Sequence, residues 1–408
     1  VVAPFKKGPD FIDAGWLALA ANQPCHNLDT FLMPADKILH SFFRHALPAE
    51  VAVIEGNRGL YDGIDLEGST STSELAKLLQ TPVVLVVDCT KSTRTVAATV
   101  LGCLQFDPAV HIAGVILNRI AGFRHESIVR KAVETYCRVP VLGAIPKLKS
   151  ESFPERHMGL VPTAEHAWAQ DSIEAAKGMA EEYLDLDGLL AVAGQALPLQ
   201  VANDQPRLEE RETALSMLGS TSFPRPRIGV VRDAAFQFYY PENLEALEAA
   251  GAEVLIVSAL SDACLPEVDG LYIGGGFPET HAKSLTHNTG FRDDVRRLAK
   301  EGLPIYAECG GLMYLGESLV LDNGTHRMAG VLPVIFGFSK RPRGHGYSVL
   351  RVERPNPYFE TGAEIRGHEF HYSSVLAWRG KSEDLAFRMA RGGGLDGKRD
   401  GICYKNTL

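Results

Sequence analysis

The stretch Gly302-Leu-Pro-Ile-Tyr-Ala-Glu308-Cys309-Gly310-Gly311-Leu-Met-Tyr-Leu315 decides the fold of the C-terminal half of the chain. Residues 303–307 form a short apolar run typical of a strand, and the residues from Leu312 onward are compatible with a helix. A sharp turn from strand to helix strains the corner residue, and small neighbours make that turn possible. The pattern therefore predicts a nucleophile elbow with Cys309 at its corner. The alternative is a buried, inert cysteine, but Glu-Cys-Gly-Gly after a strand favours the nucleophile.

A second glycine-rich loop is expected to serve the same site. The stretch Asp269-Gly-Leu-Tyr-Ile-Gly274-Gly275-Gly276-Phe277-Pro278-Glu279 is another strand that ends in glycines. Backbone N–H groups near Gly275 and Gly276, with that of Gly310, can form an oxyanion hole for a tetrahedral intermediate. Together the two stretches resemble class I glutamine amidotransferase domains. That resemblance implies hydrolysis of glutamine to ammonia through a cysteine thioester.

Length, composition and charge exclude several classes of protein. The chain has 408 residues, which is enough for two or three domains, and it is 45% hydrophobic and 22% charged, as soluble globular proteins are. Its formal net charge of −9 argues against a nucleic-acid partner. The 7 cysteines are scattered, which argues against a disulfide framework or zinc cluster and favours the cytoplasm. No apolar run reaches membrane length.

Acidic residues gather at two expected turns in the N-terminal half. In Phe5-Lys6-Lys7-Gly8-Pro9-Asp10-Phe11-Ile12-Asp13, the two aspartates share a face if a helical turn follows, so they can hold Mg²⁺ or orient a substrate. The alternative is a turn with a helix cap. In the stretch 50–63, an apolar strand ends at Glu55, the position of an acidic ligand of nucleotide-bound Mg²⁺. Here the alternative is an acid in a solvated turn.

Strands and helices are expected to alternate through the first half of the chain. The stretches 82–88, 111–119 and 139–143 read as strands, and 93–106 and 125–136 read as helices. This alternation predicts a doubly wound α/β domain over residues 1–193. A polar, proline-containing linker follows over 194–226, and a second doubly wound domain, of amidotransferase type, is expected over 227–408.

The motifs together resemble the cobyrinic acid a,c-diamide synthase family over nearly the whole chain. They include Phe-Lys-x-Gly-Pro-Asp-x-Ile-Asp, Glu-Gly-x-x-Gly-Leu-Tyr-Asp-Gly, Ile-Leu-Asn-Arg, the stretch 154–160 and Glu-Cys-Gly-Gly-Leu-Met-Tyr-Leu. The resemblance implies a P-loop NTPase-like domain of dethiobiotin-synthetase type, fused to a glutamine amidotransferase domain. It also implies a ligase that activates a tetrapyrrole carboxylate with ATP and amidates it with ammonia from glutamine.

Residue roles follow from the same resemblance. Glu55 and Asp10 would bind Mg²⁺, and Asn118 and Arg119 would bind ATP, with Asn118 at the adenine. Residues that would orient Mg²⁺ or the substrate carboxylate are Lys6, Asp10, Asp13 and Asp62, and His371 is assigned to substrate or interface contacts. A homodimer is the expected assembly.

The sequence departs from the family pattern in two places. The family has a phosphate loop ending in Gly-Lys-Thr before the Phe-Lys-x-Gly-Pro-Asp motif, and no such loop occurs here, so we expect it to precede the residues given. The catalytic histidine is expected a few residues beyond Leu408. His368 and His371 are the visible alternatives for the base.

Three alternative functions remain open at this point. In the first alternative, the acceptor is another tetrapyrrole: sirohaem, nickel-sirohydrochlorin or hydrogenobyrinic acid. The Asn57-Arg58 variant of the Glu-Gly motif could mark such a change of acceptor. In the second alternative, the chain is a catalytically inactive scaffold that binds tetrapyrrole or protein partners. The intact Cys309 motif disfavours this alternative. In the third alternative, the chain is a partitioning-type ATPase. The amidotransferase half and the acidic net charge disfavour this alternative.

Overall fold

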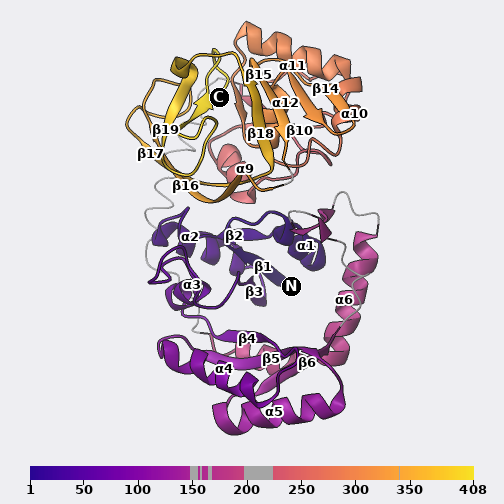
Figure 1. The fold of residues 1–408 in the computed structure, drawn as a ribbon, viewed down its shortest axis with the longest axis vertical. Coiled ribbons are helices and arrows are strands. Elements are labelled where there is room, and N and C mark those ends of the chain that lie inside the picture. The colour runs from indigo at the N-terminus through magenta and orange to yellow at the C-terminus, as the bar shows by residue number, and fades with distance from the viewer. Residues whose placement is uncertain (148–154, 157–158, 164–167, 197–223, 340) are drawn as a thin grey trace. The chain divides into compact units, whose positions relative to one another are not determined.

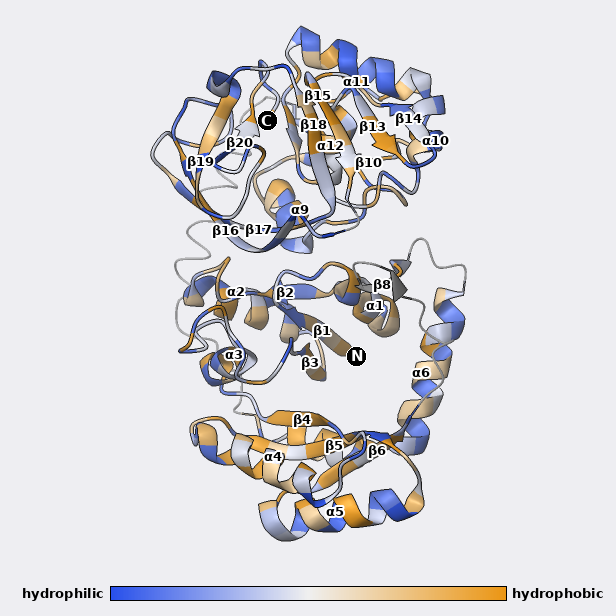
Figure 2. Cartoon of the chain, in the orientation of Figure 1, coloured by the Kyte–Doolittle hydropathy of each residue, from blue (hydrophilic) through white to orange (hydrophobic). Residues whose placement is uncertain are grey.

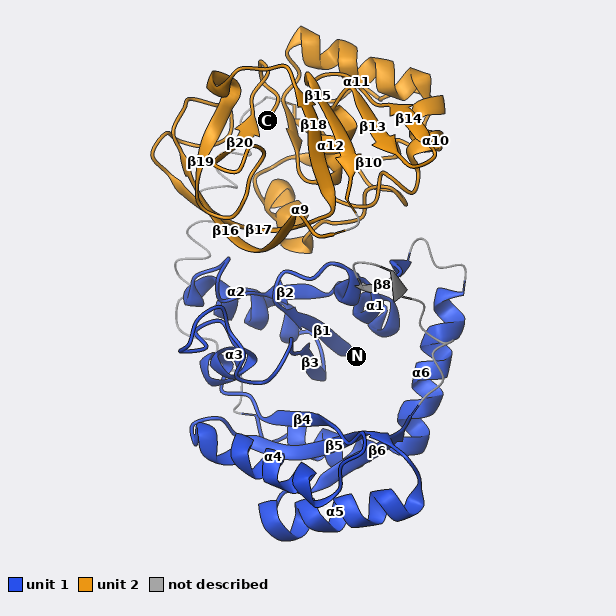
Figure 3. Ribbon diagram, viewed as in Figure 1, with its two compact units in different colours: residues 1–202 blue, residues 203–408 orange. Residues whose placement is uncertain are grey.

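The computed structural model describes residues 1–147, 155–156, 159–163, 168–196, 224–339 and 341–408, which divide into two compact units. Unit 1 comprises residues 1–202 and unit 2 residues 203–408 (Figure 3). Most of the predicted linker, 194–226, lies outside the described residues, as do residues 154, 157 and 158 of the 154–160 motif. No helix among the described residues has the length and apolar character needed to cross a membrane.

Unit 1 alternates strands with helices, as its apolar runs predict (Figure 1). The elements are β1 (Val2–Lys7), α1 (Ile12–Ala21), β2 (His26–Leu28), α2 (Ala35–Ala46), β3 (Val51–Glu55), α3 (Thr72–Leu79), β4 (Val83–Asp88), α4 (Arg94–Phe106), β5 (Ile112–Ile120), α5 (Phe123–Cys137), β6 (Val141–Pro146), β7 (Glu155–Arg156), β8 (Gly159–Leu160), α6 (Ala169–Tyr183) and α7 (Leu186–Ala193).

The strands of unit 1 form two parallel sheets, β2-β1-β3 and β4-β5-β6. The second sheet packs on α4 and α5, where Val100, Val115 and Val129 are fully buried, and its strands are strongly hydrophobic (Figure 2). Between the sheets, β3 and β4 are not paired with each other, and Val53 and Val86 are 49% and 58% exposed. The alternation is therefore as predicted, but the described strands make two short sheets instead of one.

Unit 2 begins as a parallel α/β unit and then becomes largely antiparallel. Its elements are β9 (Arg227–Val231), α9 (Pro241–Ala249), β10 (Glu253–Val257), β11 (Gly270–Ile273), α10 (Ala282–His287), α11 (Thr289–Glu301), β12 (Ile305–Ala307), α12 (Gly310–Leu315), β13 (Ser318–Leu321), β14 (Gly324–Arg327), β15 (Val334–Phe338), β16 (Gly344–Val352), β17 (Glu364–His371), β18 (Ser373–Trp378), β19 (Leu385–Arg391) and β20 (Arg399–Ile402).

A parallel sheet of order β10-β9-β11-β12 carries the elbow. Two further sheets, β14-β13-β15-β18 and β17-β16-β19-β20, consist mainly of antiparallel pairs, which the sequence analysis does not foresee. One hydrophobic core joins the parallel sheet to its neighbours, and Phe236, Phe291 and Tyr314 are fully buried in it. This core supports α11 and α12 behind the corner at Cys309.

We predict that Phe291→Ala lowers the free energy of unfolding of unit 2 by about 3–5 kcal/mol, because it empties a fully buried site in this core. Hydrogen exchange in increasing urea, detected by mass spectrometry, measures the free energy of unfolding of each unit separately. Phe123→Ala is the control, since Phe123 is 87% exposed on α5 and its loss leaves unfolding nearly unchanged. Equal effects of the two substitutions would contradict the assignment of Phe291 to the core.

Candidate active site

Cys309 occupies the corner between β12 and α12 in a left-handed backbone conformation, with φ +49° and ψ −108°. A residue with a β-carbon seldom adopts such a conformation unless its surroundings enforce it. The surroundings here are close backbone contacts: a β-carbon on Gly310 would meet Gly276 N at 3.1 Å, and one on Gly311 would overlap the carbonyl of Ile273. The elbow predicted from the sequence is therefore present. Gly311 is required by the lack of space, and a side chain on Gly310 would force its neighbours to shift.

The glycine-rich loop after β11 lies directly against the corner. An added β-carbon on Gly275 would be 3.4 Å from Cys309 Cβ, and the Gly311 N–H donates to the Gly274 carbonyl at 3.0 Å. The backbone N–H groups of Gly276 and Gly310 lie beside the Cys309 thiol. Hydrogen-bond donors in this position favour the ionised form of the thiol, and their role as an oxyanion hole stays a prediction. The structure thus brings Gly275, Gly276 and Gly310 together with Cys309.

The thiol of Cys309 needs a base to react at neutral pH. Its surface is open to solvent, yet the dense protein around it raises its pKa to about 11, and the negative charge of Glu279 adds to the rise. The N–H groups of Gly276 and Gly310 act in the opposite direction. With that pKa, only about one thiol in ten thousand is ionised at pH 7. A proton acceptor must therefore accompany the nucleophile.

His371 is held within the antiparallel sheet of β16 and β17. Its Nδ1 lies 3.2 Å from Ser373 Oγ and 3.1 Å from the Ser373 carbonyl, and its ring packs against Gly344. His368 is on the same strand, paired with Tyr347. Within the described part of the chain, neither histidine makes a hydrogen bond to Cys309. The substrate or interface role of His371 stays a prediction.

The sequence analysis missed a buried acid next to the nucleophile. The carboxylate of Glu308 accepts hydrogen bonds from the hydroxyl groups of Tyr272, at 3.2 Å, and Tyr306, and burial raises its pKa. Its N–H donates to the Ile273 carbonyl at 2.9 Å. Glu308 therefore anchors the strand side of the elbow to β11 and β12. The signal in the sequence is an acid at the end of an apolar strand, directly before the nucleophile.

In unit 1, the ends of β1 and β3 gather charged side chains around Lys6. The Lys6 ammonium lies 3.1 Å from a carboxylate oxygen of Asp13 and 3.1 Å from one of Glu55, and it donates to the Gly56 carbonyl at 3.3 Å. Asp10 accepts from the N–H groups of Ile12 and Asp13, so it also caps the start of α1. Burial raises the pKa of Asp10 and of Glu55, and repulsion from Asp13 adds to both shifts.

This group is suited to Mg²⁺ in its ligand type but is not a preformed cage. Among the described residues, the carboxylate oxygens of Asp10, Asp13 and Glu55 do not all lie within 4.8 Å of one another. Mg²⁺ in nucleotide sites is commonly held by one or two carboxylates, with phosphate and water completing its shell. Glu55 with one aspartate therefore fits the ion, and a cation there would relieve the repulsion between the acids.

The other predicted residues of unit 1 make contacts of their own. Asp62 accepts from the Gly59 N–H at 3.1 Å and closes a turn. Asn118 accepts from the Arg119 N–H at 2.8 Å, and the Arg119 guanidinium pairs with Asp88 at 3.0 Å. Within the described part of the chain, no hydrogen bond or ion pair joins Asp62, Asn118 or Arg119 to the Lys6 group.

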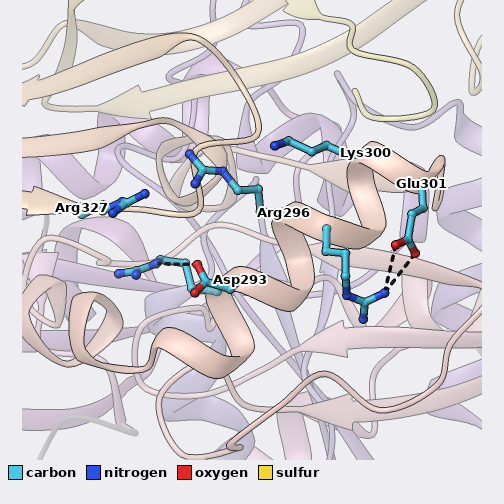
Figure 4. Close-up of a pocket in the computed structure, with 7 residues that line it drawn as sticks. Asp293, Arg296, Lys300, Glu301 and Arg327 are labelled. Atoms are coloured by element: carbon cyan, nitrogen blue, oxygen red, sulfur yellow. Dashed lines mark hydrogen bonds and ion pairs between the residues drawn. The ribbon is translucent and has the colours of Figure 1, made fainter.

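A hollow of about 550 Å³ lies elsewhere on unit 2, between α11 and β14 (Figure 4). Its lining is mainly cationic, and two of its arginines are paired, Arg297 with Glu301 at 3.0 Å and Arg292 with Asp293 at 3.8 Å. None of the residues predicted for catalysis lines it. There are therefore two separate candidate sites, the Cys309 elbow in unit 2 and the Lys6 group in unit 1.

Comparison with known families supports both halves. Residues 227–408 match the profile of the CobB/CobQ-like glutamine amidotransferase domain, and residues 28–155 match that of an AAA domain. A solved structure, PurLQS from Thermotoga maritima, aligns with 45% of this chain and 85% of its own, at 19% identity and a TM-score of 0.33.

Two curated relatives extend over the whole chain. A cobyrinate a,c-diamide synthase of Magnetococcus marinus is 46% identical over 100% of this chain and 86% of its own length. One of Archaeoglobus fulgidus is 43% identical over the same shares. With this identity over its full extent, the chain belongs to the cobyrinate a,c-diamide synthase family.

Proposed function

We propose that this enzyme amidates side-chain carboxylates of a tetrapyrrole of the cobyrinic acid type, with ATP and glutamine as cosubstrates. The observation that carries the proposal is the positive φ of Cys309 at the corner between strand and helix, with the N–H groups of Gly276 and Gly310 beside its thiol. The family relationship and the match to a glutamine amidotransferase domain support the same reaction.

The first half-reaction would release ammonia from glutamine. The Cys309 sulfur attacks the amide carbon, and the negative oxygen that develops accepts hydrogen bonds from the backbone N–H groups around Gly275, Gly276 and Gly310. Ammonia leaves with the proton taken from the thiol, and a thioester remains. Water then attacks the thioester, which releases glutamate and returns the proton to sulfur.

These proton transfers need a base close to the Cys309 thiol. Leu408 exchanges hydrogen bonds with β12: its N–H donates to the Ile305 carbonyl, and its carbonyl accepts from the Ala307 N–H at 2.8 Å. The segment around Thr407 runs parallel to β12. This pairing places residues 406–408 alongside β12, the strand that leads to Cys309.

The second half-reaction would activate the acceptor carboxylate. A carboxylate oxygen attacks the γ-phosphorus of ATP, ADP leaves, and the product is an acyl phosphate. Ammonia then attacks the acyl carbon, phosphate leaves, and a proton lost from nitrogen gives the neutral amide. Lys6, Asp13 and Asp62 would orient the acceptor, and Asn118 and Arg119 would contact the nucleotide. Glu55 and Asp10 would hold Mg²⁺, which would neutralise phosphate charge.

Another macrocycle of the same type is the second candidate acceptor. The observation that favours it is Arg58, an exposed residue with φ +55° in the loop after β3, close to the Lys6 group in sequence and fold. Sirohaem, nickel-sirohydrochlorin and hydrogenobyrinic acid carry the same reactive group. Mass spectrometry of each after incubation with glutamine and MgATP counts the carboxylates converted to amides.

We predict that Cys309→Ala abolishes amidation with glutamine, by at least about 10³-fold, because no nucleophile remains, and leaves amidation with added ammonium unchanged. Steady-state assays with each nitrogen source measure both rates. Cys264→Ala is the matched control, since Cys264 is an exposed thiol in the same unit. Loss of the ammonium-dependent reaction in Cys309→Ala would contradict the division of labour.

We predict the opposite pattern for Lys6→Ala. It removes the cation between Asp13 and Glu55, so ATP-dependent amidation falls by about 10²-fold or more with either nitrogen source, while glutamine hydrolysis continues. Lys37→Ala, at an exposed position on α2, is the control. Full amidation by Lys6→Ala would show that the group around Lys6 is structural only.

A further inference from the structure

Lys7 is a buried lysine that has no partner within the described part of the chain. It ends β1, is only 5% exposed, and its ammonium makes no hydrogen bond or ion pair with a described residue. Burial lowers its pKa, and the charges of Arg58 and Lys6 lower it further, against the opposing effect of Asp29. The neighbouring Lys6 differs, since it is paired with two acids. A buried cation without a partner destabilises the fold, so its presence calls for another explanation.

Arg58 is a second cation without a partner, and its backbone is strained. It has φ +55°, its side chain is exposed, and its guanidinium makes no ion pair with a described residue. The conformation is held from both sides: Asn57 exchanges two hydrogen bonds with the Thr72 hydroxyl, at 3.2 and 3.3 Å, and the Gly59 N–H donates to Asp62. Strain that is held in this way is typical of functional sites.

The loops that carry the two cations are in contact. A β-carbon on Gly8, which follows Lys7, would be 3.0 Å from the Asn57 side-chain nitrogen, and Asn57 precedes Arg58. Strands β1 and β3 are parallel neighbours, with Lys6 in register with Glu55, so both loops leave the same edge of the sheet. Ligands of open α/β sheets bind at this edge.

The acids nearby are already engaged. Asp13 and Glu55 pair with Lys6, and the Asp29 carboxylate accepts from the N–H groups of Phe31 and Leu32 at 2.7 and 2.9 Å. Lys7 and Arg58 therefore present two cations that make no hydrogen bond or ion pair with a described residue, beside the group proposed to activate the acceptor. Lysine and arginine in such a place recognise oxyanions.

We propose that Lys7 and Arg58 together bind an oxyanion of a substrate, either a carboxylate of the macrocycle or a phosphoryl group of ATP. The inference rests on the proposed function for the identity of these two ligands. The pair holds the anion in place beside Lys6 and takes no part in bond making. A bound oxyanion would give both cations a partner.

The test compares Arg58→Asn and Lys7→Met with the parent enzyme as the full chain. Asparagine tolerates the left-handed backbone but carries no charge, and methionine keeps most of the lysine stem. Arg138→Asn is the matched control, since Arg138 is also exposed in unit 1 with φ +57°, at the end of α5. Arg58→Lys restores the charge and is the rescue variant.

We predict that Arg58→Asn and Lys7→Met raise the KM for one of the two ligands by about tenfold, the effect of losing one charge-assisted contact, with glutamine hydrolysis unchanged. A higher KM for ATP identifies a phosphoryl group, and a higher KM for the macrocycle identifies a carboxylate. Lys7→Met also raises the melting temperature of the free enzyme, because it removes an unpaired buried charge. Arg58→Lys recovers most of the affinity.

Calorimetric titration with ATP and with cobyrinic acid measures binding without turnover. It therefore tests the role of Lys7 and Arg58 even if the parent enzyme does not amidate cobyrinic acid. Weaker binding of one ligand by both variants, and not by Arg138→Asn, supports the inference. Unchanged affinities for both ligands would overturn it. So would a lower melting temperature of Lys7→Met with an equal loss of all activities, which is what a purely structural lysine would give.

Discussion

The geometry of the elbow in unit 2 depends on the close approach of two glycine-containing backbone segments at Cys309. A β-carbon on Gly311 would overlap the Ile273 carbonyl, and one on Gly310 would be only 3.1 Å from Gly276 N. This close approach holds Cys309 at φ +49°. The same contact delivers two N–H groups to the sulfur. The strained backbone of Cys309 and the position of the N–H groups beside its thiol thus have one cause, and the fully buried core behind α12 prevents the corner from relaxing.

The two units treat charge in opposite ways. Unit 2 surrounds its thiol densely and raises its pKa to about 11, so the nucleophile stays neutral until a base removes its proton. Unit 1 instead concentrates charges of both signs at the ends of β1 and β3, where Lys6 neutralises Asp13 and Glu55. A thiol that a base ionises suits attack on an amide, and a cluster of charges suits transfer of a phosphoryl group to a carboxylate.

Sequence reasoning reached the features that depend on neighbours in the chain. The elbow and its glycines, and the acids at strand ends, follow from local patterns, and the family is confirmed by the relatives. Features that depend on distant pairing were missed: Glu308 meets Tyr272 across neighbouring strands, and β13 to β20 pair mainly in antiparallel sheets. Lys7 was not singled out either, because its burial and lack of partners appear only once β1 and β3 are adjacent.

The central claim is that Cys309 forms the covalent bond to glutamine. Acid quenching of the full-length enzyme during turnover, followed by digestion and mass spectrometry, measures this bond directly. The account predicts a glutamyl adduct on the peptide that contains Cys309 and none on the peptide with the exposed Cys264. Glutamine hydrolysis that proceeds with no adduct at Cys309, or with an adduct at another cysteine, would contradict it.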